Sequence, residues 1–579
     1  MKKTRSSLLA FLFVFSLFVH TPLTPKAQAA PDPVYDSLVF NPEAAYQGEY
    51  TIQVDSKDVV FKVYQVTYVT NPITGHSWGA WGPPCPSEDY FKMNISVPVR
   101  YDGNAFDEND TRNAPMLFYN PWGGDYGSAV GAAGSVCAMG RLALAKGWVV
   151  VEPGMRGHNC TVGTIGADDF YNYGKLPYPL VDLKAAIRYL RYAGNSRLIP
   201  GNEDLIFAAG TSSGGDATVM LGSSGDSPLY DRYLKEVGAA PTSDVVFAAA
   251  PSCPVMTRQW ADQAIAWERW GTIPDDDTDA HPINRLFANA FADYEDTLGL
   301  KAEFAVGSIG VGDTLTSDNY AEYLMAYIKQ SALKYLNSLG GKEAIDTYLA
   351  GTKSPDMYGH SKTSRSWLTP VYDAVDTDLV VDINNTWQEF WSYAVGGQTA
   401  GDAGTQMDTS ELFSMQYEKP ILAPDEAMEG NGVVNKHAGT VAFGSPYANA
   451  SSFSFGKPTD LAAAFSPAGQ YYLENIRDPK ITISAEYKTL IDLQRNCTDP
   501  LYFIIGAGAS GSTVCNNWFM RTGSVDLVTP HPVFFNLATA LQNQGKNVDA
   551  ALVWDQSHGL TTDLEGFFAF ADQLIPCAK

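Results

Sequence analysis

A serine set between glycines offers the first chemistry in this chain. Residues 210–214 read Gly-Thr-Ser-Ser-Gly, a G-x-S-x-G pattern that follows the apolar run 205–207 and precedes a helix-like segment. In this context the pattern predicts a sharp strand-to-helix turn that presents the Ser212 hydroxyl as a nucleophile. The flanking glycines allow strand and helix to approach closely around a strained backbone. The alternative is an ordinary turn rich in glycine and serine.

A histidine that could activate Ser212 follows another predicted strand. A serine hydroxyl is a poor nucleophile at neutral pH and needs a histidine to accept its proton. Among the eight histidines, His558 stands directly after the predicted strand 551–554. We therefore expect His558 to be the general base. His531, which precedes a predicted helix, is the main alternative, and solvation at the surface is the usual role of a lone loop histidine.

The acid that orients the histidine should also follow a strand. In folds with this turn, the chain order is Ser, acid, His. Asp526 follows the predicted strand 517–521 and precedes His558, with one predicted helix between the two. Asp555 is nearer to His558 along the chain, but neighbours on one loop point apart. We therefore expect Asp526 to be the acid, and Asp555 to brace the loop.

Acyl transfer also requires backbone N–H groups that stabilise the developing oxyanion. The residue after the nucleophile supplies one of them in this fold, which points to Ser213. The second should come from the loop after the strand 116–119, where the sequence reads Asn-Pro-Trp-Gly-Gly-Asp over 120–125. Because glycines have no side chain, a backbone N–H group in this pair can point at the oxyanion. We expect Gly123 to provide this N–H group.

Strands and helices alternate around these residues. Residues 48–70 and 91–100 alternate in polarity and predict antiparallel strands at one edge of a sheet. Further predicted strands are 116–119, 148–151, 205–209 and 245–250, with helices at 135–146 and 179–192. Such alternation predicts an α/β fold with a mainly parallel sheet that is covered by helices on both faces.

This alternation is interrupted in the middle of the chain. Residues 255–483 combine helices with aromatic faces, such as 387–393, with long polar loops. The core pattern returns with predicted strands at 501–505, 517–521 and 551–554 and a helix at 533–544. We therefore expect a core formed by 30–254 and 484–579, and a large inserted cap or lid formed by 255–483.

Composition and the N-terminus limit the partners and the location. Across 579 residues the net charge is −25, which disfavours nucleic acid as a partner. Residues 1–29 combine basic residues, an apolar run and an Ala-Gln-Ala motif, typical of a cleaved signal peptide. No later stretch is long and apolar enough for a membrane span. We expect a secreted, extracellular or periplasmic protein without stable membrane association.

The seven cysteines give weaker signals. Export permits disulfides, and Cys497 and Cys515 bracket a short segment, so we expect them to form a pair. No C-x-x-C motif or Cys/His cluster predicts a zinc site. The chemistry described above requires neither a metal nor an organic cofactor. The oligomeric state is not predicted by the sequence.

Several motifs together resemble the bacterial tannases and their secreted esterase relatives. They are the helix sequence 180–189, the glycine turn 210–215, Gly-Ala-Ala-Pro at 238–241, Ser-Cys-Pro at 252–254, and the closing segments 545–549 and 554–559. The resemblance covers roughly 115–260 and 485–575. It implies an α/β-hydrolase with a large cap that hydrolyses esters of aromatic acids, and it assigns Ser212, Asp526 and His558 the roles given above.

The same resemblance bears on the acyl group. In tannases, a second Asp two residues after the triad acid contacts the hydroxyls of the galloyl ring, but Val528 occupies that position here. A cap lysine has the same task in the family, and Lys419 is its candidate. Because valine cannot satisfy a buried phenol, Val528 favours a less hydroxylated acyl group.

Three hypotheses about function follow. The first is a serine esterase that acts on a small aromatic ester. The second is a serine peptidase or amidase of the same fold, which the triad alone does not distinguish from an esterase. The third is a binding protein that kept the fold without catalysis, against which three correctly ordered site residues argue.

Overall fold

The computed structural model describes most of the chain after the predicted signal peptide. It covers residues 33–575 except for 74–75, 78–86, 122, 124–125, 158–159, 163–170, 175, 195–198, 255, 258–259, 262, 265–266, 269–281, 353–363, 396–495, 498, 527 and 560–562. The predicted signal peptide 1–29 and Lys419 lie outside the described residues.

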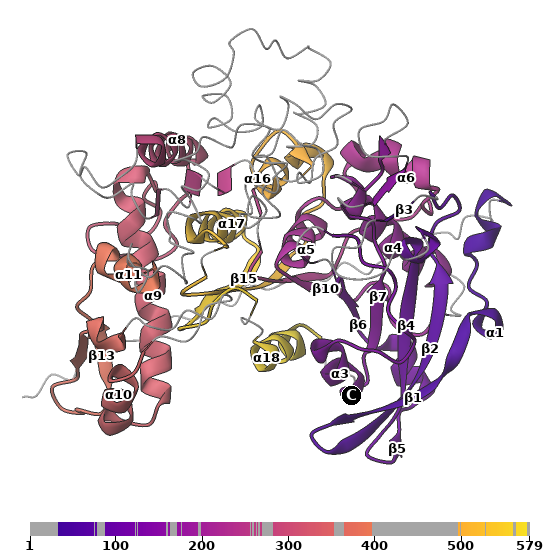
Figure 1. The fold of residues 1–579 in the computed structure, drawn as a ribbon, viewed down its shortest axis with the longest axis horizontal. Helices are drawn as coiled ribbons and strands as arrows, with labels where there is room; N and C mark the ends of the chain where they lie inside the picture. Colours follow the sequence, from indigo (N-terminus) through magenta and orange to yellow (C-terminus); the bar gives the residue numbers. More distant parts are fainter. Residues whose placement is uncertain are drawn as a thin grey trace, which may run out of the picture.

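A ten-stranded mixed sheet forms the centre of the molecule (Figure 1). Its order is β1-β2-β4-β7-β6-β10-β11-β14-β15, with β5 paired to β4. Its strands are β1 (Tyr46–Val54), β2 (Lys57–Thr67), β4 (Lys92–Tyr101), β5 (Asn104–Ala105), β6 (Met116–Tyr119), β7 (Val149–Pro153), β10 (Ile206–Thr211), β11 (Ala248–Ser252), β14 (Asn517–Gly523) and β15 (Asn547–Val553).

The sheet has an antiparallel part and a parallel part. Strands β1, β2, β4 and β7 pair antiparallel, whereas β7, β6, β10, β11, β14 and β15 pair parallel. The antiparallel edge predicted at 48–70 and 91–100 is therefore confirmed, as is the mainly parallel sheet. A separate small sheet contains β3 (His76–Ser77), β8 (Cys160–Val162) and β9 (Tyr171–Asn172).

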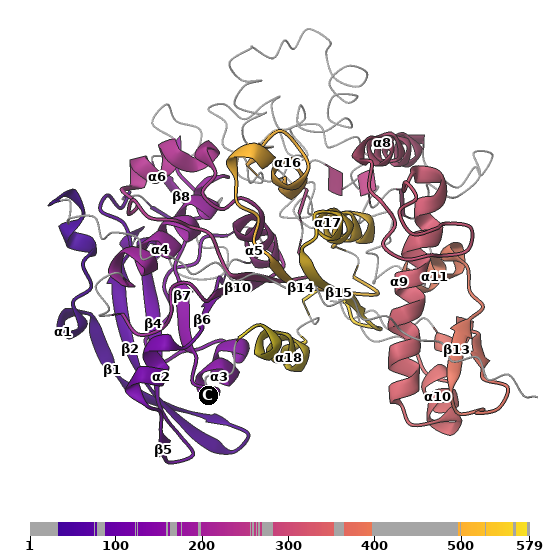
Figure 2. The same ribbon diagram turned by 180° about the vertical axis from the view of Figure 1, so that it is seen from behind.

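Helices cover both faces of the sheet (Figures 1 and 2). On one face lie α3 (Ala138–Ala145) and α18 (Leu564–Leu574); on the other lie α4 (Tyr178–Gly194), α5 (Ser213–Ser223), α6 (Asp231–Val237) and α17 (His531–Asn543). Successive residues of β6 serve the two cores: Met116 and Phe118 pack in one hydrophobic cluster, and Leu117 in the other. This period of two is what a strand buried on both faces requires.

In the chain between β11 and β14, the described residues 282–352 and 364–395 lie beside the β15 edge of the sheet (Figures 1 and 2). No described residue from 253 to 516 forms a strand of the main sheet. The described part of this segment contains α8 (Pro282–Leu298), α9 (Ser317–Ser338), α10 (Lys342–Leu349), β12 (Pro370–Tyr372), β13 (Val380–Ile383) and α11 (Trp387–Val395). The aromatic helix predicted at 387–393 corresponds to α11. The boundaries of the cap stay a prediction.

Helix α9 joins this segment to the core. The Ser331 hydroxyl donates to the Leu552 carbonyl of β15 at 3.0 Å, and the Tyr320 hydroxyl donates to the Pro532 carbonyl of α17 at 3.0 Å. The rings of Tyr327 and Phe535 stack with their centroids 3.9 Å apart. Helix α9 is therefore packed against β15 and against α17 of the core.

Two predictions near residue 500 are wrong. The predicted strand 501–505 is a helix, α16 (Pro500–Ile504), because Asp499 caps its first turn and Pro500 occupies its first position. An Asp-Pro pair is a helix-start signal, and it outweighs the apolar run that follows.

The predicted disulfide is also absent. Cys497 and Cys515 are both buried free thiols. They are held by different elements, because the Cys497 carbonyl accepts from the Tyr230 hydroxyl at 2.7 Å, whereas the Cys515 amide donates to the Gly222 carbonyl at 2.7 Å.

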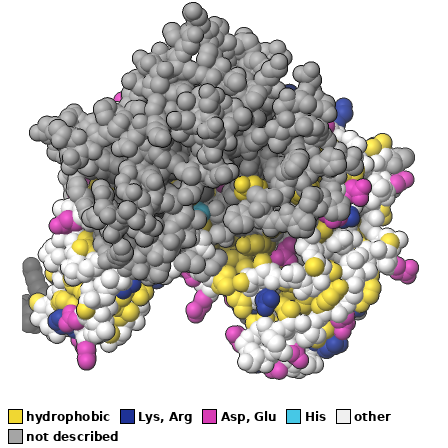
Figure 3. All heavy atoms as spheres, in the orientation of Figure 1, with side chains coloured by type: hydrophobic (Ala, Val, Ile, Leu, Met, Phe, Trp, Pro, Cys, Tyr) yellow, Lys and Arg dark blue, Asp and Glu magenta, His cyan; other side chains and the backbone are white. Residues whose placement is uncertain are grey.

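Charged side chains are dispersed over the part of this face that is not grey in Figure 3. In Figure 3, Asp and Glu side chains lie at several separate places along the outline rather than in one patch. Within the described ranges, no helix has the length and apolar character that a membrane crossing needs.

Candidate active site

Four turns meet at the carboxyl edge of the parallel strands. They hold Ser212 after β10, Cys253 after β11, Asp526 after β14 and His558 after β15. These four strands are consecutive neighbours in the sheet. Because parallel strands end at the same edge, residues far apart in the sequence are brought together there. The topology thus gathers the three residues singled out from the sequence, with one cysteine among them.

The nucleophile turn has the strained backbone that the glycine pattern predicts. Ser212 has φ 59° and ψ −126°, and its amide donates to the Ser252 carbonyl at 3.0 Å. A Cβ atom on Gly210 would lie 2.4 Å from the Gly214 carbonyl oxygen, and one on Gly215 would lie 2.5 Å from the Ser252 carbonyl oxygen. Only glycine therefore lets β10, α5 and β11 approach this closely.

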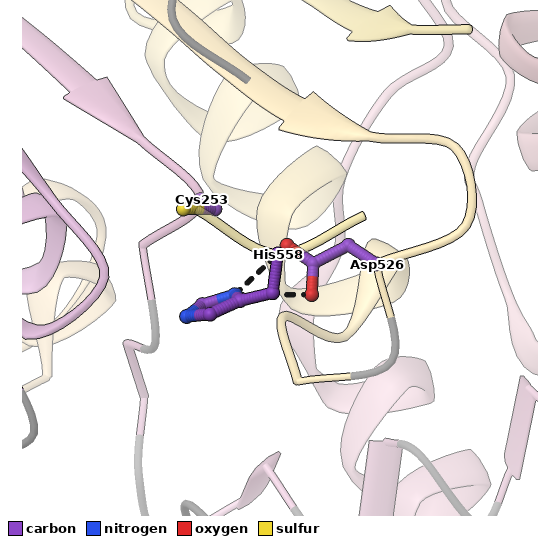
Figure 4. A group of neighbouring side chains, drawn as sticks. All are labelled: Cys253, Asp526 and His558. Atoms are coloured by element: carbon purple, nitrogen blue, oxygen red, sulfur yellow. Dashed lines mark hydrogen bonds and ion pairs between the residues drawn. The ribbon is translucent and has the colours of Figure 1, made fainter. Parts of the chain in front are cut away.

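The three predicted residues form one hydrogen-bonded series. The Ser212 Oγ lies 2.8 Å from His558 Nε2. On the other side of the ring, His558 Nδ1 lies 3.1 Å from each carboxylate oxygen of Asp526 (Figure 4). Asp526 and His558 are buried, and Ser212 is half-buried. The arrangement can remove the hydroxyl proton and hold the resulting imidazolium beside a carboxylate.

The acid turn fixes the carboxylate from both sides. Asp526 Oδ1 accepts from the amides of Val528 and Thr529, each at 2.9 Å. Asp526 Oδ2 accepts from the Thr522 hydroxyl at 3.1 Å. The carboxylate therefore keeps its orientation toward His558 without relying on the imidazole alone.

Charge pairing governs the protonation of the site. Burial acts to raise the pKa of Asp526, but the charge of His558 and the hydrogen bonds to the carboxylate outweigh it, so this pKa is lowered from 3.8. Burial acts to lower the pKa of His558, but the Asp526 charge outweighs it and holds this pKa well above 6.5. The histidine therefore becomes a neutral base only on the alkaline side of its usual range.

Ser213 and the loop after β6 are the two predicted sources of the oxyanion donors. Ser213 is buried and is the first residue of α5, directly after the nucleophile. The loop after β6 is tied to the nucleophile turn by Asn120, whose side-chain amide donates to the Ala209 and Gly214 carbonyls at 3.1 and 3.0 Å. Gly123 lies farther along this loop, and its carbonyl accepts from the Tyr126 amide at 3.1 Å. A role for Gly123 stays a prediction.

The two alternatives to the chosen base and acid have other partners. His531 is buried, and its Nε2 lies 2.9 Å from the Gly523 carbonyl oxygen, while its amide donates to Glu268 at 3.0 Å. The Asp555 carboxylate accepts from Arg365 Nε at 3.0 Å, and the Asp555 amide donates to the Ser524 hydroxyl at 2.7 Å. His531 thus braces the acid turn, and Asp555 braces the histidine loop as expected.

Sequence reasoning missed three contributors to the site. Cys253 lies beside His558, and the charge of the imidazole outweighs burial and lowers the pKa of the thiol. Asn120 locks the nucleophile turn, and Glu268 reaches the acid turn from the segment between β11 and β14. A polar residue directly after each of two buried strands was a usable signal for Asn120 and Cys253. No local signal exists for Glu268, because 263 residues separate it from His531.

The two residues suggested for substrate binding have different outcomes. Val528 is half-buried and its amide supports Asp526, so its position beside the triad acid is described. Lys419 lies outside the described residues. A role in substrate binding stays a prediction for both side chains.

Comparison with known proteins gives matches at the level of structure alone. Searches against family models and against curated proteins find no match. A tannin acyl hydrolase in complex with 3,4-dihydroxybenzoate is similar with a TM-score of 0.62 at 22% identity, covering 94% of this chain and 100% of that one. The Fusobacterium nucleatum tannase gives a TM-score of 0.61 at 24% identity, covering 93% and 99%.

A third similar structure is a tannin acyl hydrolase in complex with ethyl gallate, with a TM-score of 0.61 at 21% identity over 94% of this chain and 100% of that one. These similarities extend over nearly the whole of each chain. The resemblance inferred from the sequence motifs is therefore confirmed in the fold: this chain has the α/β fold of the bacterial tannases.

Proposed function

We propose that this protein is a serine esterase that hydrolyses esters of aromatic acids through an acyl-enzyme on Ser212. The observation that carries the proposal is the series of hydrogen bonds from Ser212 Oγ through His558 to Asp526. The strained backbone of Ser212 adds support, because such strain is concentrated at functional sites.

The residues suggest the course of the reaction. His558 Nε2 accepts the Ser212 proton while Oγ bonds to the ester carbonyl carbon, and the carbonyl oxygen becomes an oxyanion beside the Ser213 amide. His558 then donates the proton to the leaving alcohol, which leaves the acyl group on Ser212. Water then attacks the acyl carbon while His558 takes its proton. His558 returns this proton to Ser212 Oγ as the bond between Oγ and the acyl carbon breaks and the acid departs. Asp526 stays ionised and stabilises the imidazolium in both halves.

The aromatic acyl group is proposed from the relatives. Proteins of this fold carry 3,4-dihydroxybenzoate or ethyl gallate in their structures, at identities of 21–22% over nearly the full chain. Both ligands are small phenolic compounds. We therefore propose a small aromatic ester as the substrate of this chain as well.

A panel of matched esters and amides tests this function. Gallate, hydroxycinnamate and benzoate esters should be hydrolysed by the wild-type protein, and Ser212→Ala should abolish release of the acid. Chromogenic amides of the same acids test the peptidase or amidase alternative. Hydrolysis of esters that persists in Ser212→Ala would contradict the proposal, and faster cleavage of the amides would favour the alternative.

Val528 should set the preference among acyl groups. An apolar side chain beside the triad acid cannot satisfy a phenolic hydroxyl, so benzoate or hydroxycinnamate esters should be preferred over gallate. Val528→Asp should raise kcat/KM for gallate relative to benzoate by about tenfold or more, because one added hydrogen bond to a charged group stabilises by an amount that corresponds to such a factor. Val528→Leu is the matched control and should leave that ratio low. If Val528→Asp left the ratio of kcat/KM for gallate to that for benzoate unchanged, residue 528 would not contact the acyl group.

Export and the cap are further parts of the proposal. The N-terminal sequence supports cleavage near Ala30 and a secreted protein. The segment 255–483 is proposed to form a cap, supported by its insertion between two strands that carry site residues. N-terminal sequencing of the protein from the culture medium or periplasm tests the first point.

A further inference from the structure

A thiol, an imidazole and a carboxylate converge at the candidate active site. One ligand atom each from Cys253, Asp526 and His558 lies within 4.8 Å of the other two, and all three residues are buried (Figure 4). Each comes from the end of a different strand, β11, β14 or β15. Esterase chemistry as proposed above uses Asp526 and His558 but has no role for the Cys253 sulfur.

The turn that holds Cys253 is firmly placed. Its amide donates to the Arg521 carbonyl of β14 at 2.7 Å, and its neighbour Ser252 accepts from the Ser212 amide. Cys253 itself has φ 38°, a conformation uncommon outside glycine. The sulfur is therefore held beside His558 by backbone contacts to the strands on both sides, rather than by a mobile loop.

This set of donors suits a particular class of cation. Thiolate and imidazole favour Zn²⁺ and related soft or borderline ions, whereas Ca²⁺ and Mg²⁺ prefer sites built from oxygen. Tetrahedral sites with metal–ligand bonds of about 2.0–2.3 Å place their ligand atoms roughly 3.3–3.8 Å apart. Three atoms within 4.8 Å of one another need only a small contraction to reach that spacing. The half-buried Ser212 hydroxyl, or water, would complete the fourth position.

We propose that Cys253, Asp526 and His558 form an inhibitory site for one thiophilic divalent cation, such as Zn²⁺ or Cd²⁺. On binding, the thiol proton leaves to solvent and the sulfur coordinates the ion as thiolate. Coordination through His558 Nε2 removes the acceptor for the Ser212 proton, and coordination through Nδ1 breaks the bond to Asp526. Either way the ion and the reaction compete for the same imidazole. The inhibition rests on the proposed esterase function; the binding does not.

Cadmium binding to the reduced, full-length mature protein tests the site itself. A Cd²⁺–thiolate bond gives an ultraviolet charge-transfer band, so titration with CdCl₂ reports thiolate coordination without any assay of activity. Cys253→Ser nearly keeps the size of the side chain. We expect this variant to bind about one Cd²⁺ fewer per chain and to lack the corresponding charge-transfer band. Cys253→Ala repeats the test without a hydroxyl, and thermal unfolding verifies that each variant is folded.

Cys137 supplies the matched control. It is a partly accessible thiol beside a carboxylate, Glu152, which accepts from its amide at 3.0 Å. Among the described residues, Cys137 belongs to no group of three metal-ligating side chains. Cys137→Ser should keep the Cys253-dependent band. A folded Cys253→Ser protein that retains the full band and stoichiometry would overturn the proposal.

Inhibition is measured in a separate experiment. The rate of ester hydrolysis by each variant in the presence of Cd²⁺ is divided by the rate of the same variant without metal. Cd²⁺ should suppress ester hydrolysis by the wild type and Cys137→Ser, and the inhibitory concentration should rise at least about tenfold in Cys253→Ser. Equal sensitivity of all three proteins would refute the inhibitory role. If no protein hydrolyses esters even without metal, the proposed function fails, while the binding experiment still decides the site.

Discussion

The nucleophile turn and the base–acid turns are built in different ways. The turn that carries Ser212 is determined by local backbone geometry, with glycines where a Cβ atom would meet the backbone at 2.4–2.5 Å. The turns that carry Asp526 and His558 depend on side chains from distant segments. Arg365 reaches Asp555 on the histidine loop, and Glu268 reaches the acid turn.

This contrast indicates which half of the site depends on the inserted segment. Arg365 and Glu268 both belong to the chain between β11 and β14, whereas the nucleophile turn contacts only core strands in the bonds described above. We therefore expect changes in the inserted segment to disturb the base and acid while leaving the nucleophile turn intact. The predictions below probe this difference, beginning with the acid itself.

Asp526→Asn should have the largest effect on catalysis. The amide keeps the shape of the side chain but removes the charge that stabilises the His558 imidazolium, so kcat/KM should fall by a factor on the order of 10⁴. The Asp526 charge also raises the pKa of His558. The wild-type rate should therefore fall on the acidic side with an apparent pKa above 6.5, and this limb should move to lower pH in Asp526→Asn. A pH profile of kcat/KM for both proteins measures this, and an acidic limb that does not move would contradict the assigned pairing.

Arg365→Met should show how far the histidine loop depends on the inserted segment. The variant leaves the Asp555 carboxylate buried without its guanidinium partner, which should cost about 3 kcal/mol of unfolding free energy and reduce activity. Denaturant unfolding and kcat/KM measure both effects. Arg365→Met combined with Asp555→Asn should recover part of the stability, because the unpaired charge is gone and Asn tolerates the positive φ of 57° at this position.

Arg100→Met is the control for that experiment. Its pair with Glu49 has both side chains well exposed, at 44% and 39%, so the loss should be about 0–1 kcal/mol. Equal losses in Arg365→Met and Arg100→Met would show that the inserted segment does not brace the histidine loop.

Gly210→Ala should have a smaller effect, confined to the nucleophile half. The added methyl group would meet the Gly214 carbonyl, so unfolding free energy should fall by about 1–3 kcal/mol and Ser212 should lose reactivity. Gly131→Ala introduces the same methyl group where no atom lies within 4 Å and should change neither property appreciably. If the two variants had the same unfolding free energy and the same Ser212 reactivity, the close approach of β10 and α5 would not explain the glycine at position 210.

The same contrast explains what the sequence could predict. Ser212, His558 and Asp526 could be proposed because each follows an apolar strand in a fixed chain order, and the parallel sheet then brings them together. The helix α16 was missed because its apolar residues resemble a buried strand, although Asp499 and Pro500 mark a helix start. Arg365 and Glu268 could not be assigned, because their contacts join segments that only the folded chain places side by side. Cys253 had a usable signal, because it directly follows β11, but the sequence does not show its proximity to His558.

The most direct test of the central claim is the reactivity of the Ser212 hydroxyl toward a fluorophosphonate probe, located by peptide mass spectrometry. We predict that the probe modifies Ser212 in the wild-type protein, that Ser212→Ala is not labelled, and that His558→Ala is labelled far more slowly, since the imidazole can no longer accept the proton. Modification of a different serine, or equally fast labelling of Ser212 when His558 is replaced, would contradict the account.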